Sequence, residues 1–190
     1  MPAILHFPLL GEPISLDLVN TRVRHAGAYV ELLDTPSALG KWLAAESDRL
    51  PWSGAVTAAD LRAVRTLRDA IAALLSARRG SARPRRGTMK VFNTALSTSV
   101  SAIRLTWTGK GLRAEQRAAG SRRDRLLHAL AVDAVTILTG PDAKLLRVCE
   151  HPDCVLQFLA RNPRRRWCSA SVCGNRARVA RYYVRHRTNV

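Results

Sequence analysis

The C-terminal segment of this 190-residue chain lacks acidic side chains. From Val155 to Val190 there are nine arginines and neither Asp nor Glu. The whole chain carries a formal charge of +17, from 31 basic against 14 acidic residues. A segment of one sign favours polyanionic partners, because neutralising phosphate groups releases their condensed counterions. This segment is therefore the first candidate for a nucleic-acid interface.

Long apolar runs are also missing. No run approaches the roughly 18 residues that a transmembrane helix needs. The first 25 residues include Glu12 and Asp17 and lack the basic segment with which a secretory signal peptide begins. We therefore expect a soluble, cytoplasmic protein with no membrane partner.

Sequence signatures of catalysis are scarce. The chain has no Gly-rich phosphate loop, and no nucleophile lies at an informative spacing from a base. An enzyme with its site around Asp17, Asn20 or His25 is the least favoured interpretation. We predict that the protein is not an enzyme.

Apolar periodicity predicts a mostly helical N-terminal part. Hydrophobic residues make up 47% of the chain and charged residues 24%, which is typical of a globular protein. Apolar side chains recurring every three or four residues predict helices over 36–50, 60–78, 88–96 and 122–139. Alternation over 103–107, a turn, and an answering segment over 112–117 predict one β-hairpin, and 80–87 has the composition of a linker. We expect a mainly α (α+β) fold, with a helical domain over 1–143 and a small module over 144–190.

The stretch 11–21 holds two polar residues among apolar neighbours. Its pattern fits a strand or a short helix equally well, so periodicity does not decide between them. Asp17 and Asn20 are candidates for buried polar side chains that either bond to nearby backbone or line a ligand pocket. Residues 22–25 are expected to follow in a loop.

The chain has four cysteines, and all of them lie between residues 149 and 173. They form two pairs, Cys149 with Cys154 and Cys168 with Cys173, with four residues inside each pair. A thiolate quartet at such short spacings is typical of one Zn²⁺ held tetrahedrally by two loops. The alternatives are four buried thiols, a redox pair, or two disulfides, which need an oxidising compartment. We predict one structural zinc ion per chain, since four cysteines leave no open coordination position.

A basic helix is predicted after the second cysteine pair. Gly174 and Asn175 suit a tight turn because both tolerate positive φ. Beyond this turn, arginines at three- and four-residue spacing share one helix face. Guanidinium groups suit bidentate contact with phosphate and base edges. The candidate nucleic-acid contacts are Arg164, Arg165, Arg166, Arg178, Arg181 and Arg185.

Two further residues are expected to support the metal module. Arg176 falls on the other side of the helix, where we expect it to turn inward and bond to backbone carbonyls, Glu150 or Asp153. Trp167, beside Cys168, is expected to cover the site as part of a small core.

These motifs resemble those of a known family. The segments Cys149-x₄-Cys154, Arg165-Arg166-Trp167-Cys168-Ser169 and Cys173-Gly174-Asn175-Arg176, followed by a basic helix with Tyr182-Tyr183, are similar to the CGNR zinc finger. The stretch Gly11-x₄-Leu16-Asp17-Leu18-Val19-Asn20-Thr21 resembles the opening of the ABATE domain. Together the two motifs cover nearly the whole chain. The resemblance implies zinc binding by the four cysteines and DNA binding by the finger, in proteins described as candidate stress-induced bacterial transcription regulators.

The favoured function is accordingly that of a bacterial transcription regulator which binds DNA through its zinc finger. The N-terminal domain would sense a small-molecule effector or form a homodimer. An RNA-binding module and a protein-interaction module that meets an acidic partner are the alternatives. Few aromatic side chains are available for base stacking, which counts against single-stranded nucleic acid.

Overall fold

The computed structural model describes residues 7–50, 52–80, 83–99, 101–109 and 111–187. Its α-helices are α1 (Ile14–Val19), α2 (Pro36–Ala45), α3 (Ala58–Arg78), α4 (Arg86–Ser97), α5 (Arg122–Thr139) and α6 (Asn175–Arg187). A 3₁₀ turn, η1 (Pro141–Leu145), and a π-helical turn, η2 (Ala170–Gly174), complete the helical elements. Three antiparallel hairpins pair β1 (Arg22–His25) with β2 (Ala28–Glu31), β3 (Ser101–Thr108) with β4 (Gly111–Ala118), and β5 (Leu146–Val148) with β6 (Gln157–Leu159). The predicted mainly α fold is confirmed.

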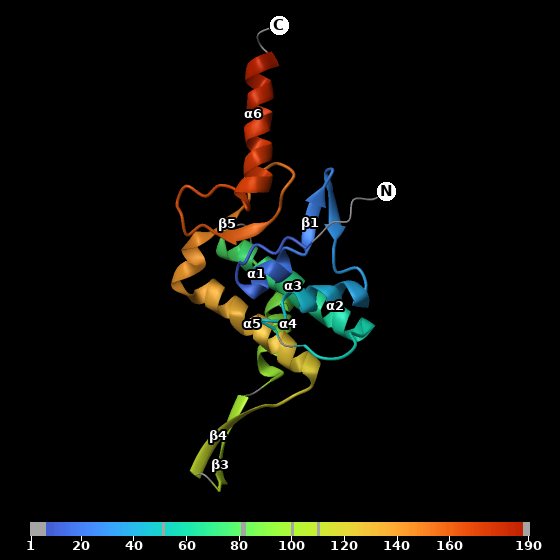
Figure 1. Cartoon of the computed structure of the whole chain (residues 1–190), viewed down its shortest axis with the longest axis vertical. Helices are drawn as coiled ribbons and strands as arrows, with labels where there is room; N and C mark the ends of the chain where they lie inside the picture. The colour runs from blue at the N-terminus through green and yellow to red at the C-terminus, as the bar shows by residue number, and fades with distance from the viewer. Residues whose placement is uncertain (1–6, 51, 81–82, 100, 110, 188–190) are drawn as a thin grey trace.

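The long helix α3 organises the N-terminal core. It packs against α1, α2, α4 and α5, which surround it (Figure 1). Its apolar side chains recur at three- and four-residue spacing, so they line one side of the helix and are buried there. These residues are Leu61, Val64, Leu67, Ile71, Leu74 and Leu75.

The stretch that periodicity left undecided is the helix α1. Every residue of α1 is buried, between α3 and α5. A helix buried on all sides has no single apolar stripe, so the spacing of its apolar residues could not distinguish it from a strand. The predicted helix 36–50 ends earlier, at Ala45, and is followed by a turn in which the Glu46 side chain binds Arg49.

Two capping boxes begin the principal helices. The Thr57 hydroxyl accepts the Asp60 N–H, and Asp60 Oδ2 accepts the Thr57 N–H at 2.9 Å. Ser121 and Asp124 form the same reciprocal pair at the start of α5. The second oxygen of Asp60 accepts from Arg123 Nε at 2.6 Å, so this carboxylate also joins α3 to α5. Both helix starts were predictable from sequence, while the Arg123 contact depends on the packing of the two helices.

Asp60→Asn is expected to lower the free energy of unfolding by about 1 kcal/mol at neutral pH, the usual effect of a damaged cap. Burial alone would raise the pKa of Asp60, but hydrogen bonds from Thr57 and Arg123 outweigh it and lower the pKa to about 2. The ionised carboxylate therefore stabilises the fold above its unfolded pKa near 3.8, and this contribution fades as the pH falls toward 2. Urea unfolding between pH 7 and pH 3 should show the wild-type advantage shrinking. The exposed Asp48→Asn change is the control, and an equal loss for both variants would contradict the prediction.

Two of the three hairpins were not predicted. The β1–β2 turn is made by Ala26 and Gly27, both with positive φ (49° and 80°), and Ala is a rare choice for such a turn. Strands β5 and β6 have three residues each, too few for a period-2 pattern to stand out. The loop expected over 22–25 is thus a strand.

The hairpin β3–β4 matches the prediction and is longer than expected. It extends away from the helices at the end of the molecule opposite α6 (Figure 1). Of the predicted linker 80–87, residues 81–82 lie outside the described residues, and the described part leads into α4.

The predicted domain boundary between residues 143 and 144 falls within η1. Beyond it, Leu146 on β5 and Leu159 on β6 belong to the same core cluster as the helices. A second cluster gathers three of the cysteines around Phe158. The β5–β6 hairpin therefore has one side in the helical core and the other in the cysteine module.

Candidate metal centre and basic helix

The four cysteine sulfur atoms lie within 4.8 Å of one another. Cys168 is central: its Sγ lies 3.8 Å from Cys154 Sγ and 3.5 Å from Cys173 Sγ, and its N–H donates to Cys149 Sγ. Tetrahedral Zn²⁺ with bonds of about 2.3 Å places its sulfur ligands about 3.8 Å apart. A disulfide needs about 2.05 Å, and all four cysteines are free. The cluster therefore has the dimensions of a Cys₄ zinc site.

The protonation of the four cysteines also favours a bound cation. The hydrogen bond with Cys168 lowers the pKa of Cys154 to about 5, so one thiolate forms readily. That hydrogen bond, followed by burial, raises the pKa of Cys168, and burial raises that of Cys173 to about 12. Further thiolates are disfavoured because they would share a small buried space with the first. A divalent cation at the centre offsets this repulsion, since thiolates are the ligand form.

Two short backbone loops present the cysteines. Cys149 follows β5 and its N–H bonds to Leu156 O, while the Cys154 N–H bonds to His151 O. The second pair is held by the π-helical turn η2, where the Gly174 N–H bonds to Ser169 O. One structural zinc ion is held by this shell, and its chemistry here is to cross-link the two loops and not to activate a substrate.

Gly174 is favoured by close packing and not by its backbone angles. A Cβ at this position would lie 3.2 Å from Cδ1 of Trp167, closer than side chains normally approach. Its φ is not in the left-handed region, and Asn175 is helical at φ −66°. The expected positive-φ turn is therefore corrected. Trp167 packs against the cysteine cluster, as a cover for the site should.

Asn20 joins the N-terminal domain to the cysteine module. Its Nδ2 donates to Gln157 O at 2.9 Å, and its Oδ1 accepts the Gln157 N–H at 2.8 Å. Asn20 is 1% exposed, so both bonds are shielded from water. Of the two roles left open for Asn20, the structure shows the bonding to backbone, and Asn20 acts as a structural clamp.

Asn20→Ala is expected to lower the free energy of unfolding by about 2–4 kcal/mol, because each buried backbone group left without a partner costs about 1–3 kcal/mol. Urea unfolding followed by circular dichroism measures the change. Asn93 on α4 is exposed, and Asn93→Ala is the matched control. Equal effects of the two substitutions would show that the clamp contributes nothing.

Asp17 is likewise a structural residue. Its Oδ2 accepts from Arg49 Nη2 at 2.6 Å and its Oδ1 from the Leu10 N–H at 3.3 Å. Burial raises the pKa of Asp17 to about 6, against the lowering effect of Arg49. Its side chain is fully enclosed. Of the two roles left open for Asp17, these contacts are those of a buried polar side chain bonded to backbone and to Arg49.

Arg165 is half-buried, and its guanidinium group is bound to residues of the protein itself. Its Nη1 donates to Glu12 Oε1 at 2.8 Å, its Nη2 donates to Cys168 O at 2.8 Å, and its guanidinium lies over the Phe158 ring. Glu12 is 5% exposed and also accepts the Leu159 N–H. Arg165 therefore plays the inward role that was predicted for Arg176. No local sequence signal marks Glu12 as the partner, because it lies 153 residues away.

The neighbouring arginines remain at the surface. Arg164 is exposed. Arg166 pairs with Glu150 at 2.6 Å and lies over the Trp167 ring. Arg176 is exposed, contrary to the expectation that it would turn inward. Arg176 borders the surface pocket beside Asp153 and Cys154, but no hydrogen bond or ion pair of its side chain to the module is found among the described residues.

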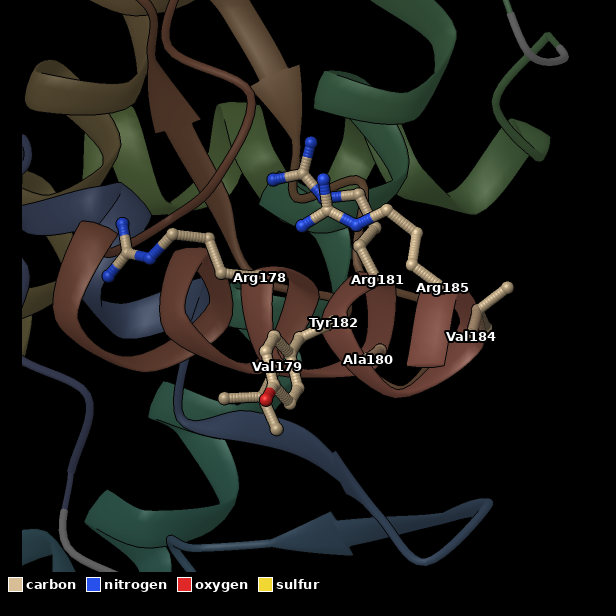
Figure 2. Close-up of a pocket in the computed structure, with 7 residues that line it drawn as sticks. All are labelled: Arg178, Val179, Ala180, Arg181, Tyr182, Val184 and Arg185. Atoms are coloured by element: carbon tan, nitrogen blue, oxygen red, sulfur yellow. The ribbon is translucent and has the colours of Figure 1, made fainter. Parts of the chain in front are cut away.

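Helix α6 extends away from the body of the molecule, with its first turn against η2 (Figure 1). Arg178, Arg181 and Arg185 are exposed, and their guanidinium groups lie on one side of the helix, while Val179 and Tyr182 point to another (Figure 2). Arg178, Arg181 and Arg185 therefore share one face of α6, as their spacing in the sequence predicts.

Comparisons with known proteins follow the same division of the chain. Residues 12–141 match the ABATE family model, described as "putative stress-induced transcription regulator". The chain belongs to the ABATE family. Residues 146–186 match the CGNR zinc finger. Neither is a family of enzymes.

This ABATE protein has no match among curated proteins. In the described part of the chain, no helix combines the length and the apolar composition that a bilayer span requires.

Proposed function

We propose that this ABATE protein is a transcription regulator that binds double-stranded DNA through α6 and the surface around Arg164. The observation that carries the proposal is the geometry of α6: three exposed arginines on one face of a helix that stands clear of the body and is anchored at one end by the zinc module. A helix of this kind fits the major groove, whose width admits one α-helix.

The charge of the surrounding segment supports the proposal. No acid follows Cys154 in residues 155–190, so the arginine face has no acidic neighbour in its own helix or in the loop before it. The family description, a transcription regulator, also supports it. The ABATE domain would then supply the regulatory input.

The proposal is tested by selection from a fragmented genomic DNA library, followed by anisotropy titration of enriched and non-enriched fragments at 150 mM salt. A regulator should enrich discrete fragments and bind them about 10³-fold or more tightly than bulk DNA. Single-stranded and double-stranded RNA of matched length are competitors. Recovery of bulk DNA without enrichment, or preferential displacement by RNA, would contradict the proposal.

A further inference from the structure

A pocket of about 430 Å³ lies where the ABATE domain meets the cysteine module. One wall is formed by Ala72 and Ser76 on α3 and by Arg79, the residue that caps the C-terminus of α3. The β1–β2 hairpin forms the second wall, and residues of β5, β6 and their loop form the third. The volume lies within the roughly 300–1,000 Å³ usual for small-molecule sites.

Arg79 is the first sign of what the pocket would bind. It is partly buried, and its Nη1 donates to the side-chain oxygen of Gln157 at 2.5 Å. Among the described residues it has no acidic partner. Burial lowers the pKa of Arg79, which reflects a cation removed from water without a compensating anion. A buried charge of this kind normally has a counter-ion.

Arg22 supplies a second positive charge at the same pocket. Its guanidinium carbon lies 4.9 Å from the centre of the Tyr29 ring, and both side chains line the cavity. Within the described part of the chain, Arg22 also forms no ion pair. The stacking on Tyr29 holds its position without neutralising its charge.

The remaining charges of the pocket cancel. Arg68 forms a bidentate ion pair with Glu31, at 2.6 Å for both bonds, and also pairs with Asp69 at 3.0 Å. Asp69 is the acid that lines the cavity. Glu31 also pairs with Arg65 at 3.5 Å, so the two acids Glu31 and Asp69 are balanced by the two arginines Arg65 and Arg68. The pocket therefore has two cations, Arg22 and Arg79, that no acid of the described chain offsets.

The other lining residues are mostly small and apolar: Val19, Ala72, Val148 and Val155. We propose that the pocket binds a small organic oxyanion, a carboxylate or a phosphate ester, with its charged group at Arg79 and Arg22 and its carbon skeleton against these valines. Guanidinium groups bind both kinds of oxyanion, because each presents at least two acceptor oxygens to the paired N–H donors.

Ligand binding in the pocket would affect the contacts that hold the zinc module against the ABATE domain. Gln157, which accepts from Arg79, is the residue whose backbone Asn20 clamps. An anion that draws Arg79 toward itself competes with the Gln157 contact, so ligand binding is coupled to the junction between domain and module. A regulatory effect on DNA rests on the proposed function, whereas the binding site does not.

The experiment titrates phenyl phosphate, benzoate and inorganic phosphate into zinc-loaded, full-length protein by isothermal calorimetry. Ionic strength is held constant with sodium chloride, because a protein of charge +17 attracts anions diffusely. We expect saturable one-to-one binding of an organic probe, weakened by at least about tenfold in Arg79→Met, the effect of losing a charge-assisted hydrogen bond. Stronger binding of phenyl phosphate than of benzoate would assign the site to phosphate esters, and the reverse order to carboxylates.

Arg78→Met is the matched control, since Arg78 is adjacent, exposed, bonded to Leu138 O and absent from the pocket wall. It should change the Kd by less than about twofold. No saturable binding of any probe at millimolar concentration overturns the proposal. So does an equal loss in Arg78→Met and Arg79→Met, which would mean diffuse charge attraction.

A second variant guards against a folding defect in Arg79→Met. Ser76→Phe leaves every charge in place and fills the cavity, so it should abolish binding while the thermal unfolding midpoint is kept. Retained binding in Ser76→Phe would overturn the proposed location. If DNA binds as well, probe and DNA must change each other's Kd by the same factor. A protein that binds the probe but not DNA would keep this site and lose the proposed function.

Discussion

Cys168→Ser is expected to release the zinc ion and to unfold the segment from Cys149 through α6. Cys168 is the sulfur at the centre of the quartet, within 3.8 Å of Cys154 Sγ and 3.5 Å of Cys173 Sγ. Structural zinc contributes about 10–16 kcal/mol of apparent binding free energy to small modules. The helix α6 has 13 residues, and isolated helices of that length are marginal in water. Without the zinc-held turn η2, α6 loses the element against which it packs.

Metal content and hydrogen exchange measure this result. We expect zinc to fall from about one equivalent to a small fraction, and amides of η2 and α6 to lose protection, while those of α3 and α5 keep most of theirs. The helical core should be weakened but folded, because Leu146 and Leu159 are its only buried contributions from beyond η1 in the described residues. Ser171→Ala, at an exposed position in the turn η2, is the control. Full zinc retention with unchanged exchange in α6 would rule out the closed Cys₄ shell.

The second large effect is expected on DNA. Replacing Arg178, Arg181 and Arg185 together by alanine should weaken binding on the order of 100-fold near 0.1 M salt, because each lost phosphate contact removes about 0.9 from the slope of log K against log salt. The slope should therefore become shallower by between two and three. Anisotropy titrations at several salt concentrations give both numbers. Zinc content and circular dichroism confirm that the variant keeps its module, since alanine favours a helix.

A control of equal charge separates the helix face from the general basicity of the chain. Arg62, Arg86 and Arg113 are exposed and lie on α3, α4 and β4, so their triple replacement removes three charges elsewhere. This control should change affinity by only a few fold. Equal losses in the two triple variants would mean that α6 has no special contact with DNA and that the net charge alone attracts it.

The arginines show where sequence reasoning reached its limit. The shared face of Arg178, Arg181 and Arg185 could be predicted, because within a regular helix the spacing fixes the direction of each side chain. Arg165 could not be placed in the same way, because it lies in a loop and its direction is set by Glu12 in a distant part of the chain. Its inward orientation follows from its contacts with Glu12, Cys168 O and the Phe158 ring.

The sequence by itself determined the zinc shell, the capped helices α3 and α5, the hairpin β3–β4 and the basic helix. Each depends on residues close together in the chain, whose spacing encodes the geometry directly. The tertiary structure decided the rest: the burial of α1, the Asn20 clamp on Gln157, the inward turn of Arg165 and the pocket at Arg79. These features join residues that are far apart in sequence, and their partners are chosen by packing, which no local pattern records.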